Sequence, residues 1–134
     1  MKKITLLLLI GFFMVSSMAI SQTVDVTFRV DMQDQTVDPN GVHIAGSFQG
    51  WIPADNPLTS PVFGYIWETT IAINIGEAIE YKFTNGDDWS QPEPSSGPCF
   101  SGGNRSLTVP AFDTTLMAVC FGSCTPCVGG YPGR

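Results

Sequence analysis

Basic residues are scarce in this chain of 134 residues, which has six lysines and arginines against twelve aspartates and glutamates. The formal net charge is −6 at pH 7, and it becomes about −8 without Lys2 and Lys3. So few cations offer no complementary surface for nucleic acid, and anionic lipid is an equally poor partner. A neutral ligand such as a glycan suits this balance better, although acidity also keeps a protein soluble without any partner.

Groups that carry common enzyme chemistry are also missing. His43 is the single histidine and lies in an expected strand, so no persuasive Ser-His-Asp grouping is present. The glycine-rich stretch 46–50 leads to neither a helix nor a lysine, as a phosphate-binding loop would. The adjacent Asp87 and Asp88 are better explained by turn formation than as the carboxylate pair of a glycoside hydrolase. We therefore expect no catalysis and no metal or organic cofactor.

Long apolar runs are confined to the N-terminus. Lys2 and Lys3 precede the apolar segment Ile4–Val15, and Ala19–Ser21 fits a small-x-small cleavage site. This pattern is typical of a secretory signal peptide, and the apolar run is too short for a convincing membrane anchor. The sequence therefore predicts a signal peptide over residues 1–21 and a secreted protein, periplasmic, cell-surface or extracellular, with no membrane insertion after cleavage.

Cysteine is absent until Cys99 and then occurs at Cys120, Cys124 and Cys127. An even number in a secreted chain favours disulfides, and of the three possible connectivities we expect Cys99–Cys120 with Cys124–Cys127. A zinc site formed by this cluster and His43 is an alternative that the export signal and the lack of further histidines oppose. A redox role for the CTPC motif would need a βαβ context, and none is visible.

No segment after residue 21 keeps a helical period, whereas alternation of period two recurs. In residues 23–32 every second residue is apolar, which predicts a half-buried antiparallel strand. Six or seven short strands in about 100 residues, without an internal repeat, predict an all-β protein with a sandwich architecture. Besides 23–32, we expect strands at 42–46, 65–73, 79–84, 105–109 and 114–121.

The tryptophans fall into two kinds of position. Trp67 shares the alternation of its strand and is expected in the core, whereas Trp51 and Trp89 follow turns. A tryptophan after a turn is often a lid over the core, but two such rings near a polar strand face offer surfaces on which sugar rings pack. Lys82 then supplies a hydrogen-bond donor for sugar hydroxyls, and Asn104 supplies both a donor and an acceptor.

The segments that carry these residues resemble the motifs of glycogen- and starch-binding modules. VHIAGSFQGW (42–51), YKFTNGDDW (81–89) and NRSLTV (104–109) occur in the order and with the approximate spacing of carbohydrate-binding module family 48. The likeness is strongest to the glycogen-binding domain of the AMP-activated kinase β-subunit, weaker to family 20 starch-binding modules, and covers roughly residues 24–109. It implies an immunoglobulin-like (early-set) antiparallel β-sandwich that binds α-glucan without catalysis. The two sugar-cradling tryptophans of the family fall on Trp51 and Trp89, and its hydrogen-bonding lysine and asparagine fall on Lys82 and Asn104.

The chain departs from that family in its export signal, its cysteine-rich end and an inserted loop before Asn104. We expect a signal peptide at 1–21, a carbohydrate-binding-module-like domain at 22–121, and a Cys/Gly-rich tail or linker at 122–134 that can lead into other domains of a longer secreted protein. The expected function is non-catalytic binding of a starch- or glycogen-like polysaccharide. The alternative is a structural or protein-interaction module of a cell-surface protein, in which the two tryptophans are buried or far apart.

Overall fold

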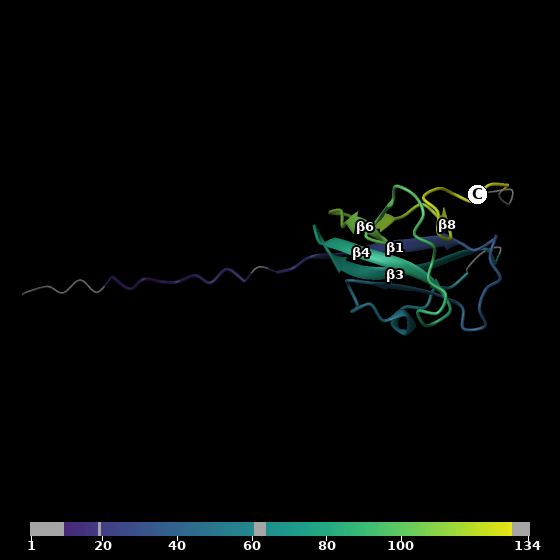
Figure 1. The fold of residues 1–134 in the computed structure, drawn as a ribbon. Coiled ribbons are helices and arrows are strands. Elements are labelled where there is room, and N and C mark those ends of the chain that lie inside the picture. Colours follow the sequence, from purple (N-terminus) through teal and green to yellow (C-terminus); the bar gives the residue numbers. More distant parts are fainter. Residues whose placement is uncertain (1–9, 19, 61–63, 130–134) are drawn as a thin grey trace, which may run out of the picture.

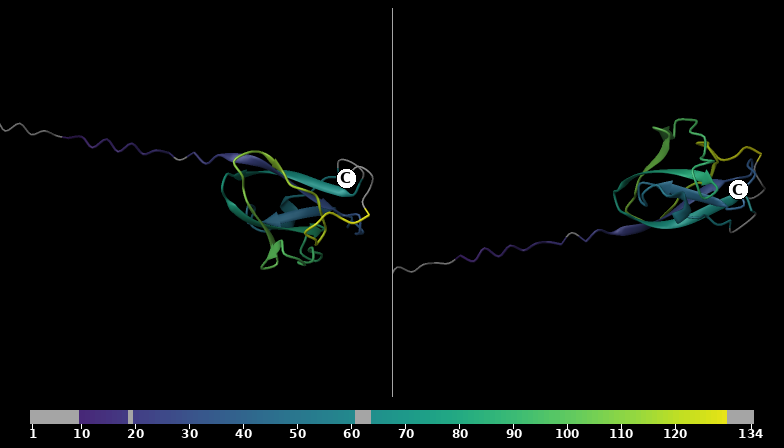
Figure 2. Two further views of the ribbon diagram at one scale, coloured as in Figure 1. Left: turned by 90° about the horizontal axis from the view of Figure 1, so that it is seen from above. Right: turned by 60° about the horizontal axis from the view of Figure 1, so that its bottom comes forward.

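Two β-sheets packed face to face make up the body of the protein in the computed structural model, which describes residues 10–18, 20–60 and 64–129 (Figures 1 and 2). The predicted all-β sandwich is confirmed. No helix in these residues is long and apolar enough to span a bilayer. The first sheet contains β1 (Thr23–Asp31), β3 (Ile66–Asn74), β7 (Thr114–Thr115) and β8 (Val119–Cys120). The second contains β2 (Val42–Gly46), β4 (Ala78–Asn85), β6 (Asn104–Thr108) and β5 (Phe100–Ser101), and a short 3-10 helix η1 spans Pro53–Asp55.

The predicted alternation places the core between the sheets. Successive side chains of a strand point to opposite faces, so the apolar residues of β1 all face inward. The sheets bury these residues together with the alternating Ile79, Tyr81 and Phe83 of β4. Trp67 of β3 is half-buried and packs against the same cluster. The buried side chains that β1 and the residue after it contribute are Val24, Val26, Phe28, Val30 and Met32.

The register of the second sheet determines which side chains share its outer face. β2 and β4 pair antiparallel with Ala45 opposite Lys82, and β4 and β6 pair antiparallel with Tyr81 opposite Arg105. Tyr81 and Arg105 face inward and are buried. The next residues along, Lys82 and Asn104, therefore leave the sheet on its outer face at neighbouring positions.

The C-terminal half differs from the expected strands in two places. The single strand expected at 114–121 is split into β7 and β8, because each pairs in parallel with a different part of β1. The Pro/Ser/Gly-rich segment before Asn104, expected to be loop, contains the short strand β5, which pairs with the start of β6. Part of the chain between β4 and β6 projects from the body of the sandwich, as the green segment in Figure 2 shows.

All four cysteines form disulfides, but the predicted pairing is wrong. The structure joins Cys99 to Cys124 and Cys120 to Cys127. Cys120 lies in β8 of the first sheet, and the Cys120 N–H donates to the Thr125 carbonyl, 2.9 Å away, which returns the chain beside β8. The intervening turn sends Cys124 outward to the loop before β5. The sulfurs are thus no longer free thiolates for a metal, and the two cysteines of the CTPC motif are not bonded to each other.

The signal peptide expected at the N-terminal end of the chain stays a prediction. Residues 10–18 run as an exposed segment away from the sandwich, while residues 1–9 and 19 of the expected signal peptide lie outside the described residues. The domain boundary at residue 121 also stays a prediction. Both disulfides nevertheless join residues beyond it to the sandwich. The end of the expected tail, 130–134, lies outside the described residues.

Candidate functional site

The turn after β2 holds Trp51 in an unusual backbone conformation. Gly46 has no room for a side chain, since a Cβ there would lie 2.6 Å from the Glu80 carbonyl oxygen. Gly50 has a φ of 75°, and Trp51 follows with a φ of 63°, the one positive value at a described residue other than glycine. A left-handed conformation costs an L-residue roughly 1–2 kcal/mol. Such strain at an aromatic residue marks the turn as a candidate site.

Trp51 and Trp89 lie side by side although they are 38 residues apart in the sequence. Their ring centroids are 6.3 Å apart and their planes are inclined by 39°. The Trp89 indole N–H donates to the Trp51 carbonyl oxygen over 3.3 Å, so the strained residue provides the acceptor that fixes the second ring. Trp89 is 43% exposed and Trp51 is half-buried. The two rings, which we call the tryptophan pair, therefore present a joint apolar surface to solvent.

Lys82 is held by the loop that precedes β6. Its Nζ donates to Ser95 Oγ over 2.6 Å and to the Gly103 carbonyl over 2.8 Å. An ammonium group has three N–H donors, so two are used within the protein and one remains. Among the described residues no hydrogen bond joins Lys82 to the tryptophan pair.

Asn104 begins β6 on the same outer face as Lys82. Its backbone pairs with Ser101 of β5. Within the part of the chain that the structure describes, no hydrogen bond is made by the Asn104 side chain, which is half-buried. Its amide thus keeps both donor and acceptor capacity for a ligand. The structure brings the two tryptophans into contact and places Lys82 and Asn104 together, all on the second sheet or on loops attached to it.

A shallow groove also crosses the outer face of β4 and β6. It has a volume of about 480 Å³ and is lined by residues 78–80 and 106–108. Neither tryptophan lines it. The tryptophan pair is therefore separate from this groove.

The adjacent carboxylates serve the turn before Trp89. Asp87 Oδ1 accepts a hydrogen bond from the Asn40 side chain over 3.1 Å, and Asp88 Oδ1 accepts from the Ser90 hydroxyl and backbone N–H. The hydrogen bond from the Ser90 hydroxyl and, to a smaller extent, the one from the Ser90 backbone N–H hold the pKa of Asp88 below the ordinary value of 3.8. A general acid for glycoside hydrolysis needs a raised pKa instead. The geometry thus supports turn formation at these positions.

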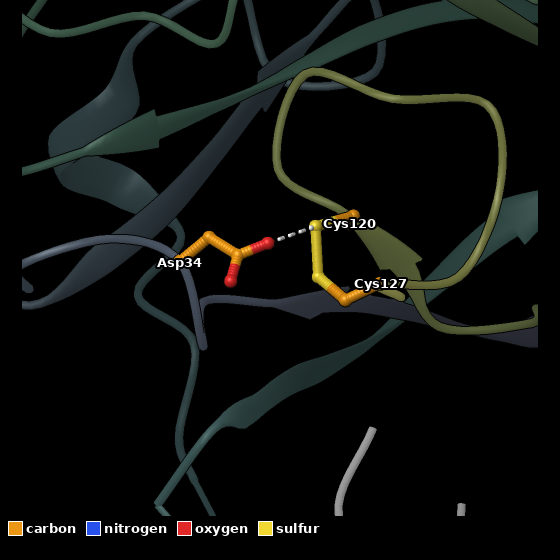
Figure 3. A group of neighbouring side chains, drawn as sticks. All are labelled: Asp34, Cys120 and Cys127. Atoms are coloured by element: carbon orange, nitrogen blue, oxygen red, sulfur yellow. Dashed lines mark hydrogen bonds between the residues drawn. A yellow bond between two sulfur atoms is a disulfide. The ribbon is translucent and has the colours of Figure 1, made fainter. Parts of the chain in front are cut away.

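A second group of ligand-type atoms lies at the first sheet. Asp34 carries a carboxylate oxygen 3.4 Å from Cys120 Sγ, and the sulfurs of Cys120 and Cys127 are bonded to each other (Figure 3). A disulfide sulfur bears neither a proton nor the thiolate charge that metal ligation requires. This group is therefore a disulfide with a neighbouring carboxylate.

Sequence reasoning missed Gln49, which stabilises the turn that carries Trp51. Its side-chain oxygen accepts from the Ile52 N–H over 2.8 Å, and its side-chain nitrogen donates to the Ile52 carbonyl. A glutamine in a loop has no periodicity that would reveal this role. The ring of hydrogen bonds locks the residue before Gly50 to the residue after Trp51.

A buried ion pair, also missed, lies beneath the loop that holds Lys82. Glu93 is 1% exposed and Arg105 is 4% exposed, and the guanidinium donates to both carboxylate oxygens, over 2.9 and 2.7 Å. The carboxylate also accepts from the backbone N–H groups of Phe83 and Gly122, each over 3.1 Å. Glu93 lies between two prolines in a polar stretch, so nothing in the local sequence indicates its burial.

Comparisons with known proteins place similar sequences within larger enzymes. The chain is 38% identical over 72 residues to an amylopullulanase of Thermoanaerobacter thermohydrosulfuricus, and 38% identical over 90 residues to an α-amylase of Niallia circulans. The matches cover 52% and 65% of this chain, but only 5% and 7% of those two proteins. No protein-family model matches the chain.

The fold also resembles part of a solved enzyme structure. The glycoside hydrolase family 15 glucoamylase from Hypocrea jecorina matches with a TM-score of 0.55 at 22% identity. The match covers 80% of this chain and 19% of the glucoamylase chain. At this identity the likeness concerns the fold alone.

Proposed function

We propose that this protein binds an α-glucan of the starch or glycogen type through Trp51 and Trp89 and does not cleave it. The observation that carries the proposal is the tryptophan pair, with ring centroids 6.3 Å apart and Trp89 43% exposed. A sugar ring that covers both indoles removes apolar surface from water, which favours binding. The shared hydrogen bond holds the rings in place before a ligand arrives, so little ordering remains to be done.

The names of the similar proteins favour a glucan as the ligand. Two are named as an amylopullulanase and an α-amylase, and the structural match is a glucoamylase, all starch-degrading enzymes. Because this chain corresponds to 5%, 7% and 19% of them, it fits an accessory module better than a catalytic domain. Other domains of a longer protein are proposed on the same ground.

Lys82 and Asn104 complete the proposed site. The third N–H of the Lys82 ammonium and the unused amide of Asn104 lie at neighbouring positions of the outer face, where they can bond to sugar hydroxyls. We also propose that the protein is secreted, which is compatible with its two disulfides, since such bonds persist in oxidising compartments.

Native affinity electrophoresis, in gels with and without amylopectin, tests the proposal. We expect amylopectin to retard the wild type. Removal of a central aromatic contact costs about 2 kcal/mol or more, so Trp51→Ala and Trp89→Ala should each weaken binding roughly 30-fold. Phe112→Ala is the matched control, because Phe112 is 68% exposed and lies outside the tryptophan pair.

The gel gives opposite results for the two hypotheses. Retardation that survives Phe112→Ala and is lost in both folded tryptophan variants supports glucan binding. Unchanged mobility of the wild type at high polysaccharide contradicts it and favours the structural module. Release of reducing sugar from starch would instead show that the protein is an enzyme.

A further inference from the structure

The loop that holds Lys82 consists of residues 95–103, the second half of the connection between β4 and β6, and it is joined to Lys82 at both of its ends. Besides the two bonds from Lys82, the Ser95 hydroxyl donates to the Gly103 carbonyl over 2.7 Å. Ser95, Gly103 and the ammonium thus form a closed set of three hydrogen bonds. The direction of the remaining Lys82 N–H therefore depends on the position of this loop.

A disulfide fixes the middle of the loop. Cys99 is bonded to Cys124, and the Cys99 N–H lies 3.0 Å from the Cys124 sulfur. Gly97 lies so close that an added Cβ would be 2.8 Å from the same sulfur. A Cβ on Gly122 would lie 2.6 Å from Cδ of Pro94, the residue directly before the loop. The loop is thus packed tightly on the turn at residues 122–124.

The buried ion pair fixes the two flanks of the loop. Glu93 precedes it and Arg105 follows it, and their bidentate contact closes the loop at its base. Arg105 also donates to the Ser123 carbonyl over 2.9 Å, and the Gly122 N–H donates to Glu93. The same pair therefore holds both the loop and the turn that carries its disulfide partner.

We propose that the Cys99–Cys124 disulfide and the Glu93–Arg105 ion pair are positioning groups for the ligand, because they hold the loop that aims the Lys82 ammonium. This inference rests on the proposed glucan binding. A free lysine loses rotamer freedom when it binds a ligand, whereas Lys82 is already held by two oxygens. Asn104 adjoins Arg105 directly and is held by the same arrangement.

The experiment compares the two disulfides by calorimetric titration with maltoheptaose as the probe. Cys99→Ser with Cys124→Ser frees the loop, while Cys120→Ser with Cys127→Ser removes the other disulfide and is the matched control. We expect the first pair to weaken binding roughly 2- to 10-fold, the ordering cost of one long side chain. The second pair should bind as the wild type does.

A second arm separates positioning from general loss of stability. Both serine pairs are repeated with Lys82→Met, whose own loss of affinity is measured first. If the disulfide acts through Lys82, Cys99→Ser with Cys124→Ser has no further effect in this background. Ser95→Ala, which removes one Lys82 acceptor and leaves the disulfide intact, should show the same dependence on Lys82 and replaces the serine pair if that pair does not fold.

The outcomes distinguish this inference from the proposed function. Wild-type affinity in the first serine pair, or an equal loss in the Lys82→Met background, overturns the positioning role. Glucan binding through the tryptophan pair then still stands, provided that Trp89→Ala abolishes it. Absence of maltoheptaose and amylopectin binding by the wild type overturns both.

Discussion

The tryptophan pair and the buried ion pair invert the usual distribution of side chains. Trp89, with one of the largest apolar side chains, is 43% exposed, whereas the charged Glu93 and Arg105 are 1% and 4% exposed. Charged residues are almost never fully buried unless they are paired, and large aromatic residues are mostly buried. The tryptophans and Glu93 lie on loops attached to the second sheet, and Arg105 lies in its strand β6. The two pairs differ in how many of their contacts are made within the protein.

The ion pair has its partners inside the protein. The Glu93 carboxylate accepts four hydrogen bonds, two from Arg105 and two from backbone N–H groups. Such an arrangement offsets the cost of removing both charges from water, and it leaves no hydrogen-bonding capacity of the carboxylate for a ligand. The two rings of the tryptophan pair share one hydrogen bond, from the Trp89 indole to the Trp51 carbonyl, and they have a strained backbone at Trp51 and uncovered ring surface. The ion pair can therefore act on a ligand only through the loop that it holds, whereas the tryptophan pair leaves apolar surface that a ligand can contact directly.

Removal of the buried carboxylate should have the largest effect. Glu93→Ala leaves Arg105 buried without its counter-charge, so we expect a loss of about 3–5 kcal/mol in the free energy of unfolding. Glu68→Ala is the matched control, because the Arg29–Glu68 ion pair, at 3.3 Å, is about one-third exposed. The control should lose about 0–1 kcal/mol. Urea unfolding measures both, and equal losses would remove the contrast between the buried and exposed pairs.

Replacement of Trp51 by glycine or alanine isolates the backbone strain. Both changes remove the ring, but only glycine adopts a φ of 63° without strain. We therefore expect Trp51→Gly to be more stable than Trp51→Ala by about 1 kcal/mol, with glucan binding lost in both. Equal unfolding midpoints in urea would show that the conformation at residue 51 stores no strain.

Truncation of Trp89 should have the smallest effect on stability. Its ring is largely outside the core, so Trp89→Ala should change the free energy of unfolding by less than about 1 kcal/mol while binding is lost. Trp67→Ala, in contrast, removes a ring packed against the core and should cost at least about 2 kcal/mol. If thermal denaturation shows a loss for Trp89→Ala as large as for Trp67→Ala, Trp89 is a core residue rather than an exposed surface.

The strands were predictable because their signal is local. The apolar residues at every second position of 23–32 specify which face is buried, and β1 has that face inward. Val42–Gly46 was predicted to the residue. The segment 114–121 was expected to be one strand but forms two. The local sequence does not show this division, because it depends on two short parallel pairings with β1, some 90 residues earlier in the sequence.

Some features of the site could be predicted from the local sequence and others could not. Glycines before Trp51 indicated a sharp turn, and the structure has one. The contact of Trp51 with Trp89 was an expectation from the family resemblance, since no local pattern relates residues 38 positions apart. The cysteine pairing was predicted wrongly, because proximity in the sequence does not reveal where the turn at 122–124 directs each sulfur.

The sequence by itself determined the five longer strands β1, β2, β3, β4 and β6, their inward faces and the sharp turn at Trp51, because these follow from side-chain alternation and from the conformational freedom of glycine. Only the tertiary structure decided which sulfurs meet, that Glu93 and Arg105 are buried together, and how Lys82 is held. These contacts join residues of different strands and loops that lie 7 to 25 positions apart in the sequence. Their geometry is set by the packing of the two sheets, which no local pattern of residues encodes.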